Sequence, residues 1–195
     1  MMPLNVQAEI IDISIDQPKA QDRFFVDSNV WFWVGYSRVS MSGARPYQTK
    51  YYPNYLTNAL NSQSTLLKCV LSFSELAHTV EKTEWEIFKS LNPTIGQKDF
   101  RHNYPAERAK VVTEIQYAWA LADAMTNQTS LPINIDQPLI DVCLQDLQTH
   151  ELDGYDLMMV HALRQSGITQ VITDDGDFAQ VPNLQVFTAN KNVIQ

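Results

Sequence analysis

Short apolar runs alternate with longer amphipathic stretches along this 195-residue chain, and this alternation restricts the possible folds more than any other feature. The runs that fit buried strands are 23–27, 65–71, 168–173 and 184–187. The stretches with apolar residues near helical spacing are 72–91, 105–126 and 154–165. Strands that alternate with helices indicate an α/β protein, a three-layer sandwich with a mainly parallel central sheet flanked by helices.

Charge and composition exclude some classes of protein. The formal net charge of −8 argues against binding nucleic acid through bulk positive charge, but a nuclease that meets phosphate through a bound metal stays possible. No window has about 18 consecutive apolar residues, and the N-terminus lacks the basic start of a signal peptide. Cys69 and Cys143 lie in apolar runs and are expected to be buried free thiols, consistent with a cytoplasmic location and no membrane association.

Acidic residues stand where the predicted strands end and the predicted helices begin. Asp27 follows the first buried run, Glu75 is expected in the first turn of a helix capped by Ser72 or Ser74, and Asp156 lies in the first turn of another helix. The acids that follow the penultimate strand are Asp174, Asp175 and Asp177. Because strand carboxyl ends and helix N-termini meet at one edge of a parallel sheet, the fold should gather these acids.

Gathered carboxylates need a cation. Two carboxylates about 4 Å apart repel by about 4 kcal/mol at an effective dielectric constant of 20. Helix N-termini offset only about 0.3–1 kcal/mol each. Mg²⁺ prefers oxygen ligands and keeps several waters, and a pair of such ions can activate water and stabilise the leaving oxygen of a phosphodiester. A divalent metal site is therefore expected.

Four motifs in this order resemble the PIN-domain family of VapC-like endoribonucleases. They are F-V-D-S-N-V at 25–30, S-x-S-E-L at 72–76, D-x-x-x-V-H-A-L-x-x-x-G at 156–167 and I-T-D-D-G-D-F at 172–178. The resemblance covers about 23–82 and 131–190. It implies one PIN-like domain over 1–195. The period-two alternation of 9–16 predicts an N-terminal strand extension (about 5–20), and the stretch outside the resemblance is expected to be a helical insertion (about 83–130).

The resemblance also implies roles for individual residues. The catalytic metal ligands would be Asp27, Glu75, Asp156 and Asp175, with Asp177 binding the metal directly or through water. The supporting residues would be Asn29, Thr173 and Asp174. The metal would be Mg²⁺ or Mn²⁺ and the substrate RNA. The family further implies the toxin of a toxin–antitoxin pair, an antitoxin-like protein partner and a homodimer.

Weaker signals concern contacts with RNA. The candidate cations are Arg38, Arg45, Lys50 and Arg101. Three of them lie in the stretch 37–55, which its proline, glycine and polar residues predict to be a loop, with a helix following at 54–63. The tyrosines of this stretch either stack on bases or pack on one another, and the sequence does not decide between these interpretations.

Two other functions compete with the nuclease. A catalytically silent PIN-like module would bind RNA or a protein partner, but such modules usually lose an acid and all four positions are filled here. A phosphatase of the haloacid-dehalogenase type would need a second aspartate two residues after Asp27, where Asn29 stands, and its expected lysine is not evident.

Overall fold

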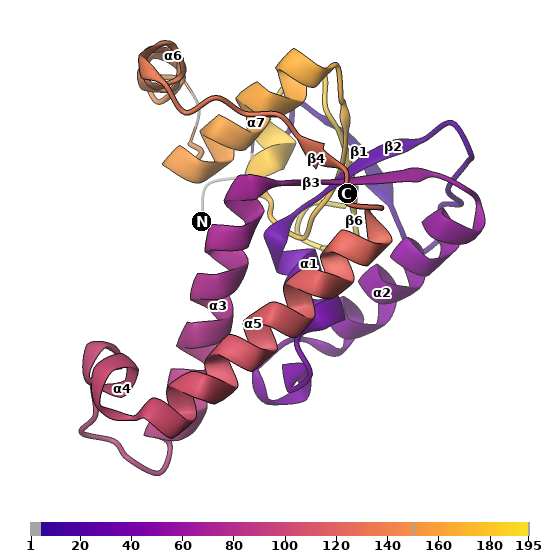
Figure 1. Ribbon diagram of the computed structural model, residues 1–195. Coiled ribbons are helices and arrows are strands. Elements are labelled where there is room, and N and C mark those ends of the chain that lie inside the picture. The colour runs from indigo at the N-terminus through magenta and orange to yellow at the C-terminus, as the bar shows by residue number, and fades with distance from the viewer. Residues whose placement is uncertain (1–4, 150, 195) are drawn as a thin grey trace.

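A six-stranded parallel sheet forms the centre of the computed structural model, which describes residues 5–149 and 151–194 (Figure 1). Its strands, in spatial order, are β1 (Glu9–Asp12), β6 (Gln185–Thr188), β5 (Gln170–Ile172), β2 (Arg23–Val26), β3 (Thr65–Cys69) and β4 (Ser130–Leu131). Every pair of neighbouring strands is parallel. The α/β fold with a parallel sheet is therefore confirmed.

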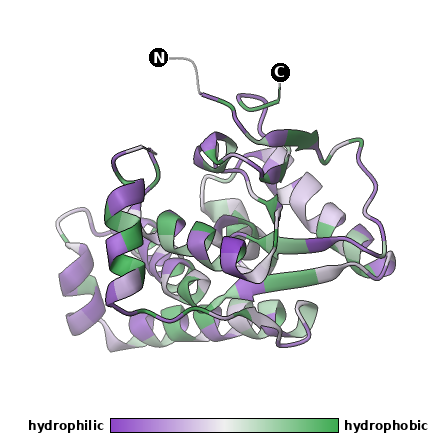
Figure 2. Ribbon diagram, turned by 90° about the horizontal axis from the view of Figure 1, so that it is seen from above, coloured by the Kyte–Doolittle hydropathy of each residue, from purple (hydrophilic) through white to green (hydrophobic). Residues whose placement is uncertain are grey.

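Helices cover both faces of the sheet and make three layers. The α-helices are α1 (Ser28–Gly35), α2 (Pro46–Asn61), α3 (Val70–Lys89), α4 (Gln97–Asn103), α5 (Pro105–Met125), α6 (Gln137–Asp146) and α7 (Gly154–Ser166). Phe24 and Val26 pack with α1, α2, α3 and α5, while Phe25 packs with α6 and α7. Both faces of the sheet are mainly apolar, and green predominates on the strands in Figure 2, whereas green and purple alternate on the helices.

The strand order reverses between β2 and β5. From β2 the chain continues to β3 and β4 on one side, whereas β5 continues to β6 on the other. Val26, the last residue of β2, lies beside Ile172, the last residue of β5. Ligands of open α/β sheets bind outside the carboxyl ends of the strands at such a reversal.

The stretch expected to be a loop is largely helical, which corrects the prediction for 37–55. A short 3-10 helix, η1, spans Val39–Met41, and α2 begins at Pro46 rather than near Asn54. Proline suits a first helical position because it has no N–H to leave unbonded there. Tyr52 and Tyr55 are buried in the core, and Tyr55 packs edge-on against Phe24. These two tyrosines therefore pack inside the protein and do not stack on bases.

Helix α3 also begins earlier than the serine pattern predicts. Its N-cap is Cys69, which ends β3, and no side chain caps the helix. The Ser72 side chain is fully buried inside the helix and has no hydrogen-bond partner. Glu75 consequently lies in the second turn, not in the first.

The last third of the chain follows the prediction closely. Asp153 caps α7 by accepting hydrogen bonds from the backbone N–H groups of Tyr155 and Asp156. Gly167 ends the helix in the left-handed conformation, with φ of 63°. A 3-10 helix, η2 (Asp177–Gln180), follows β5.

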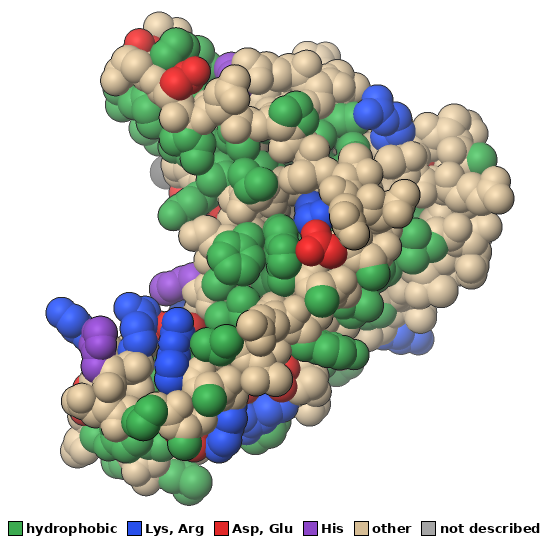
Figure 3. All heavy atoms as spheres, in the orientation of Figure 1, with side chains coloured by type: hydrophobic (Ala, Val, Ile, Leu, Met, Phe, Trp, Pro, Cys, Tyr) green, Lys and Arg blue, Asp and Glu red, His purple; other side chains and the backbone are tan. Residues whose placement is uncertain are grey.

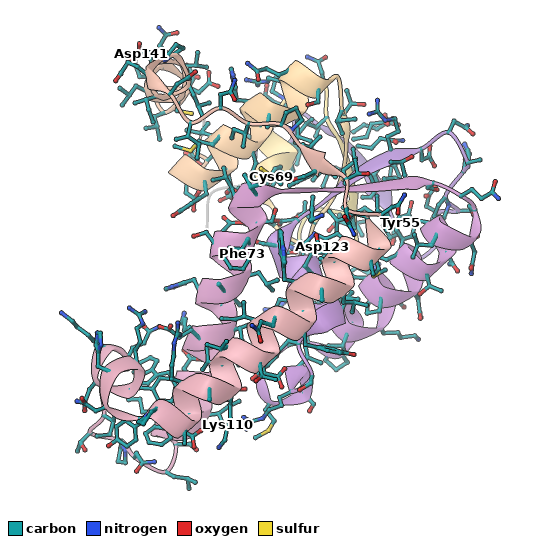
Figure 4. All side chains as sticks on the ribbon, viewed as in Figure 1. Tyr55, Cys69, Phe73, Lys110, Asp123 and Asp141 are labelled. Carbon is teal, nitrogen blue, oxygen red and sulfur yellow. The ribbon has the colours of Figure 1, made fainter. Side chains whose placement is uncertain are left out.

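A buried lysine ties α5 to the sheet. Lys68 of β3 is 3% exposed, and its Nζ lies 2.8 Å from Asp123 Oδ1 and 2.9 Å from Thr126 Oγ1. Figure 4 shows Asp123 on α5 and Phe73 on α3, and Phe73 packs edge-on against Trp119 of α5. These contacts hold α3 and α5 together as they extend away from the sheet.

Two expectations from composition can be compared with the fold. Cys69 and Cys143 are buried and form no disulfide, as predicted. Within residues 5–149 and 151–194, no helix combines the length and apolar character required to cross a membrane.

We predict that Gly35→Ala destabilises the fold. A Cβ on Gly35 would lie 2.7 Å from Ala118 Cα, so α1 and α5 would have to move apart. Overpacking of this kind costs about 1–3 kcal/mol, more than the gain in helix propensity. Urea denaturation measures the loss. The control is Gly96→Ala, whose Cβ meets nothing within 4 Å, and an equal loss there would contradict the prediction.

Candidate metal site

Asp27 follows β2 directly and is held in place from several directions. Asp27 is 4% exposed, and its carboxylate accepts hydrogen bonds from the Ser28 backbone N–H at 2.6 Å and the Thr173 hydroxyl at 2.6 Å. The Asn29 amide also donates to it. Asp27 is the N-cap of α1, although Ser28 and Asn29 are also residue types that commonly cap helices. Its conformation is therefore fixed before any ligand arrives.

The turn after β5 brings two more acids to this edge. Thr173 Oγ1 accepts a hydrogen bond from the Asp175 backbone N–H at 2.9 Å, and Asp175 Oδ1 accepts one from the Asp177 N–H at 2.9 Å. Thr173 therefore links Asp27 to the turn that carries Asp175. The predicted supporting residues Asn29 and Thr173 both contact Asp27.

Helix α7 supplies Asp156 from its first turn, as the sequence indicates. Asp156 is 9% exposed. One carboxylate oxygen from each of Asp156, Asp175 and Asp177 lies within 4.8 Å of the others, which is compatible with a shared metal ion. Among residues 5–149 and 151–194, these three aspartates are the group of acidic, histidine or cysteine side chains whose ligand atoms lie close enough to share an ion.

Glu75 approaches from α3 and leaves one oxygen without a partner. Its Oε2 is buried and accepts no hydrogen bond. A buried acceptor without a partner loses its hydration and receives nothing in return. Glu75 lies near enough to Asp27 and Asp175 for their charges to raise its pKa.

The pKa values show how strongly these carboxyls resist ionisation together. Burial, aided by the charge of Asp175, raises the pKa of Asp27 to about 6. Burial and the charge of Asp27 raise the pKa of Glu75 to about 7 and that of Asp156 to about 8. Burial and the charge of Asp175 also raise the pKa of Asp177. The neighbouring charges that raise these pKa values belong to other carboxylates.

These features fit a divalent cation. The donors are all oxygens, which Mg²⁺ and Mn²⁺ accept, and the unpartnered Glu75 Oε2 is available to a ligand. A cation would offset both the repulsion and the desolvation that raise the pKa values. The acidic cluster can therefore hold a metal ion.

Asp174 turns away from this cluster. Its Oδ2 accepts hydrogen bonds from the Tyr47 hydroxyl at 2.9 Å and the Gln48 amide at 2.7 Å, and its Oδ1 accepts one from the Tyr52 hydroxyl at 2.7 Å. These contacts fasten α2 to the turn after β5. The structure thus gives two adjacent aspartates, Asp174 and Asp175, different surroundings.

The candidate RNA-binding cations differ in their partners. Arg38 pairs with the buried Glu84 at 2.6 Å, and Arg101 pairs with Glu81. Arg45 is exposed at the start of α2, and Lys50 lies over the Tyr51 ring, 5.3 Å from its centroid. Two of these four cations are therefore engaged by acids of α3, and the other two lie on or beside α2.

A pocket of about 560 Å³ opens beside the acids. It is lined by Ser28, Ser74, Glu75, His78, Thr79, Asp153 and Tyr155. Asp153 is not among the sequence-predicted site residues, although its charge raises the pKa values of Glu75 and Asp156. His78 was missed. Its spacing of three residues from Glu75 on one helix was the available signal.

Comparisons with known proteins give one distant likeness. No protein-family model matches the chain, and no curated protein matches it. The chain is similar to a solved structure described as VapBC2 from Rickettsia felis bound to a DNA fragment from their promoter, with 13% identity and a TM-score of 0.47. The match covers 84% of this chain and 96% of that one.

We predict that, without divalent metal, the folded protein loses stability as pH rises from about 4 to 8. Asp27, Glu75 and Asp156 have folded-state pKa values above the ordinary value of about 4. The folded state therefore binds more protons than the unfolded chain in this window, and the free energy of unfolding falls with pH. Thermal melts in EDTA at pH 5 and pH 8 measure the fall.

Asp156→Asn removes the carboxyl with the highest of these three pKa values, so it should flatten the pH dependence and raise the Tm at pH 8 by about 5 °C. The exposed Glu86→Gln on α3 is the control and should behave like the parent. If Asp156→Asn keeps the parent's pH dependence, burial does not raise the pKa of Asp156 and the prediction is wrong.

We predict that substitutions at Asp174 and Asp175 affect different properties, the first the free energy of unfolding and the second the response to metal. Asp174→Asn places an amide N–H₂ against donors from α2, so it should lower the free energy of unfolding by about 1–3 kcal/mol while metal still raises the Tm. Asp175→Asn should abolish the Mn²⁺-dependent rise in Tm. Thermal melts across a Mn²⁺ titration separate the two. Identical metal responses in both variants would contradict this division of roles.

Proposed function

We propose that this protein is a metal-dependent endoribonuclease of the PIN type that hydrolyses RNA phosphodiester bonds. The observation that carries this proposal is the acidic cluster: oxygens of Asp156, Asp175 and Asp177 lie within 4.8 Å of one another, and Asp27 and Glu75 lie near enough for carboxylate charges to raise their pKa values. These five are the acids that the sequence resemblance assigns to the metal. The buried Glu75 Oε2 without a partner supports the same assignment.

The surroundings of each acid indicate its role in the proposed reaction. Asp156, Asp175 and Asp177 have oxygens close enough to share one Mg²⁺ or Mn²⁺ ion. Asp27, held by Ser28, Asn29 and Thr173, presents a fixed carboxylate beside them. A divalent ion held there would make a water more acidic and would neutralise charge on the phosphate. Carboxylates of the cluster would accept hydrogen bonds from the attacking water and orient it.

The adjoining pocket suits a nucleic acid backbone. Hydroxyl groups of Ser74 and Thr79 and the imidazole of His78 line it and can donate hydrogen bonds to phosphate or ribose oxygens. Tyr155 is 46% exposed on its wall, so its ring is available to stack on an unpaired base. These features favour a single-stranded substrate.

The family resemblance extends the proposal to biology. Toxins of toxin–antitoxin pairs share the four motifs, and an antitoxin-like partner would insert a basic side chain into the acidic cleft. A homodimer and one PIN-like domain over 1–195 follow from the same resemblance, and the buried free thiols of Cys69 and Cys143 are consistent with a cytoplasmic location. The candidate RNA contacts of Arg38, Arg45 and Lys50 belong to this proposal as well.

We predict that the purified protein cuts a labelled single-stranded RNA with Mg²⁺ or Mn²⁺ and that EDTA stops the cleavage. The double variant Asp27→Asn/Asp175→Asn should lose cleavage by about 100-fold or more, because both substitutions remove negative oxygen donors from the metal. Gel analysis of cleavage rates measures this loss.

The control Asp141→Asn changes an exposed acid on α6 that is not part of the acidic cluster, and it should cut like the parent. Circular dichroism should show all three proteins folded. Cleavage by the folded double variant at the parental rate would refute the assigned site.

A further inference from the structure

A basic surface begins at the edge of the acid pocket and continues along α3 onto α4. We define it as the basic track, formed by His78 and Lys82 on α3 and Lys98 and Arg101 on α4. All four residues are exposed. His78 also lines the pocket, so the track and the pocket are continuous.

Positive charge is concentrated in this part of a strongly acidic protein. Residues 81–110 hold six of the fourteen Lys and Arg residues but five of the 22 acids. The rest of the chain has eight basic and seventeen acidic residues. Charges on the surface are screened beyond about 8 Å at physiological ionic strength, so a polyanion meets this region separately from the acidic remainder.

Helical spacing aligns the α3 part of the track with the pocket. Lys82 follows His78 by four residues and therefore lies on the same face of the helix. From Glu75 to Lys82 the helix rises by about 10 Å, so the α3 part of the track leads away from the acids in steps of about one turn.

A buried carboxylate fixes α4 beside α3. Glu81 is 6% exposed and accepts hydrogen bonds from Arg101 Nε at 2.8 and 3.0 Å and from Arg108 Nη1 at 2.6 Å. Burial opposes ionisation, yet the two guanidiniums hold the pKa of Glu81 below its ordinary value. Two arginines share one carboxylate, and their side chains stay 44% and 39% exposed, which leaves net positive charge at the surface.

The shape of the molecule agrees with this path. Figure 3 shows a hollow between the part that carries α6 and α7 and the arm formed by α3, α4 and the start of α5. Lys and Arg side chains gather on the arm beside this hollow. A strand that enters the hollow therefore passes the basic arm.

We propose that the basic track binds the phosphates of the RNA segment that lies beyond the acid pocket. This inference rests on the proposed function, because it takes the pocket as the site of the scissile phosphodiester. Lys82, Lys98 and Arg101 contact phosphates without reading bases. The track thereby gives an acidic protein its affinity for a polyanion and orients the strand across the metal site.

Binding, not cleavage, tests the track. In the Asp27→Asn/Asp175→Asn background, fluorescence anisotropy measures the Kd of a labelled oligouridine of about 12 nucleotides. Lys82→Glu/Lys98→Glu should weaken binding by about tenfold at low salt. It should also reduce the slope of log K against log salt by about 1.4, since each single-strand phosphate contact contributes about 0.7. Neither substitution touches the Glu81 ion pairs.

The matched control is Lys19→Glu/Lys191→Glu, which changes the net charge equally at two other exposed lysines. It should change the Kd by less than about twofold. A uridine dinucleotide, which fills only the pocket, should compete equally with both variants. Equal weakening by the two double variants, or no binding of the parent, would overturn the proposal.

Two further results separate the possibilities. If poly-glutamate of equal charge competes as strongly as RNA, the track binds acidic peptide and the RNA assignment is wrong. If the protein with intact acids cuts no RNA but the track variant still weakens binding, the proposed nuclease activity fails while the track stands. If the protein with intact acids cuts RNA but Lys82→Glu/Lys98→Glu leaves the Kd unchanged, the proposed nuclease activity stands and the proposed role of the basic track is wrong.

Discussion

Repulsion among carboxylates at the carboxyl edge of the sheet is the constraint on which the rest of this structure depends. Asp27, Glu75 and Asp156 come from three different elements, yet each has a raised pKa because it is buried near the others. Such an arrangement is unfavourable without a cation. The fold tolerates it because the scaffold fixes the backbone positions of these acids independently of their charge.

Hydrogen bonds between elements provide that scaffold. Thr173 joins Asp27 to the backbone of Asp175, so the carboxyl ends of β2 and β5 are held together. On the other side of the same turn, Asp174 binds the hydroxyls of Tyr47 and Tyr52 and fastens α2. Asp174 therefore anchors the turn to α2, whereas Asp175 lies in the acidic cluster. Two adjacent aspartates thus have different roles, one structural and one chemical.

The same separation of tasks appears in the distribution of charge. Acids gather where the sheet ends, whereas six of the fourteen basic residues lie between 81 and 110, on the arm. Glu81 organises this arm by joining Arg101 of α4 to Arg108 of α5. A metal site and a cationic surface can coexist in one acidic chain because they are carried by different elements.

The sequence by itself determined the fold class, because apolar patterns report burial. It also indicated that acids at strand ends and helix starts gather at one sheet edge, where the structure brings Asp156, Asp175 and Asp177 together. It also identified α7, whose Asp153 and Gly167 cap it locally. Tertiary structure decided what depends on distant partners. Tyr52 and Tyr55 became core residues because Pro46 begins a helix that packs on the sheet. The division between Asp174 and Asp175 likewise required α2, about 120 residues away in the chain, since no local pattern distinguishes two adjacent aspartates.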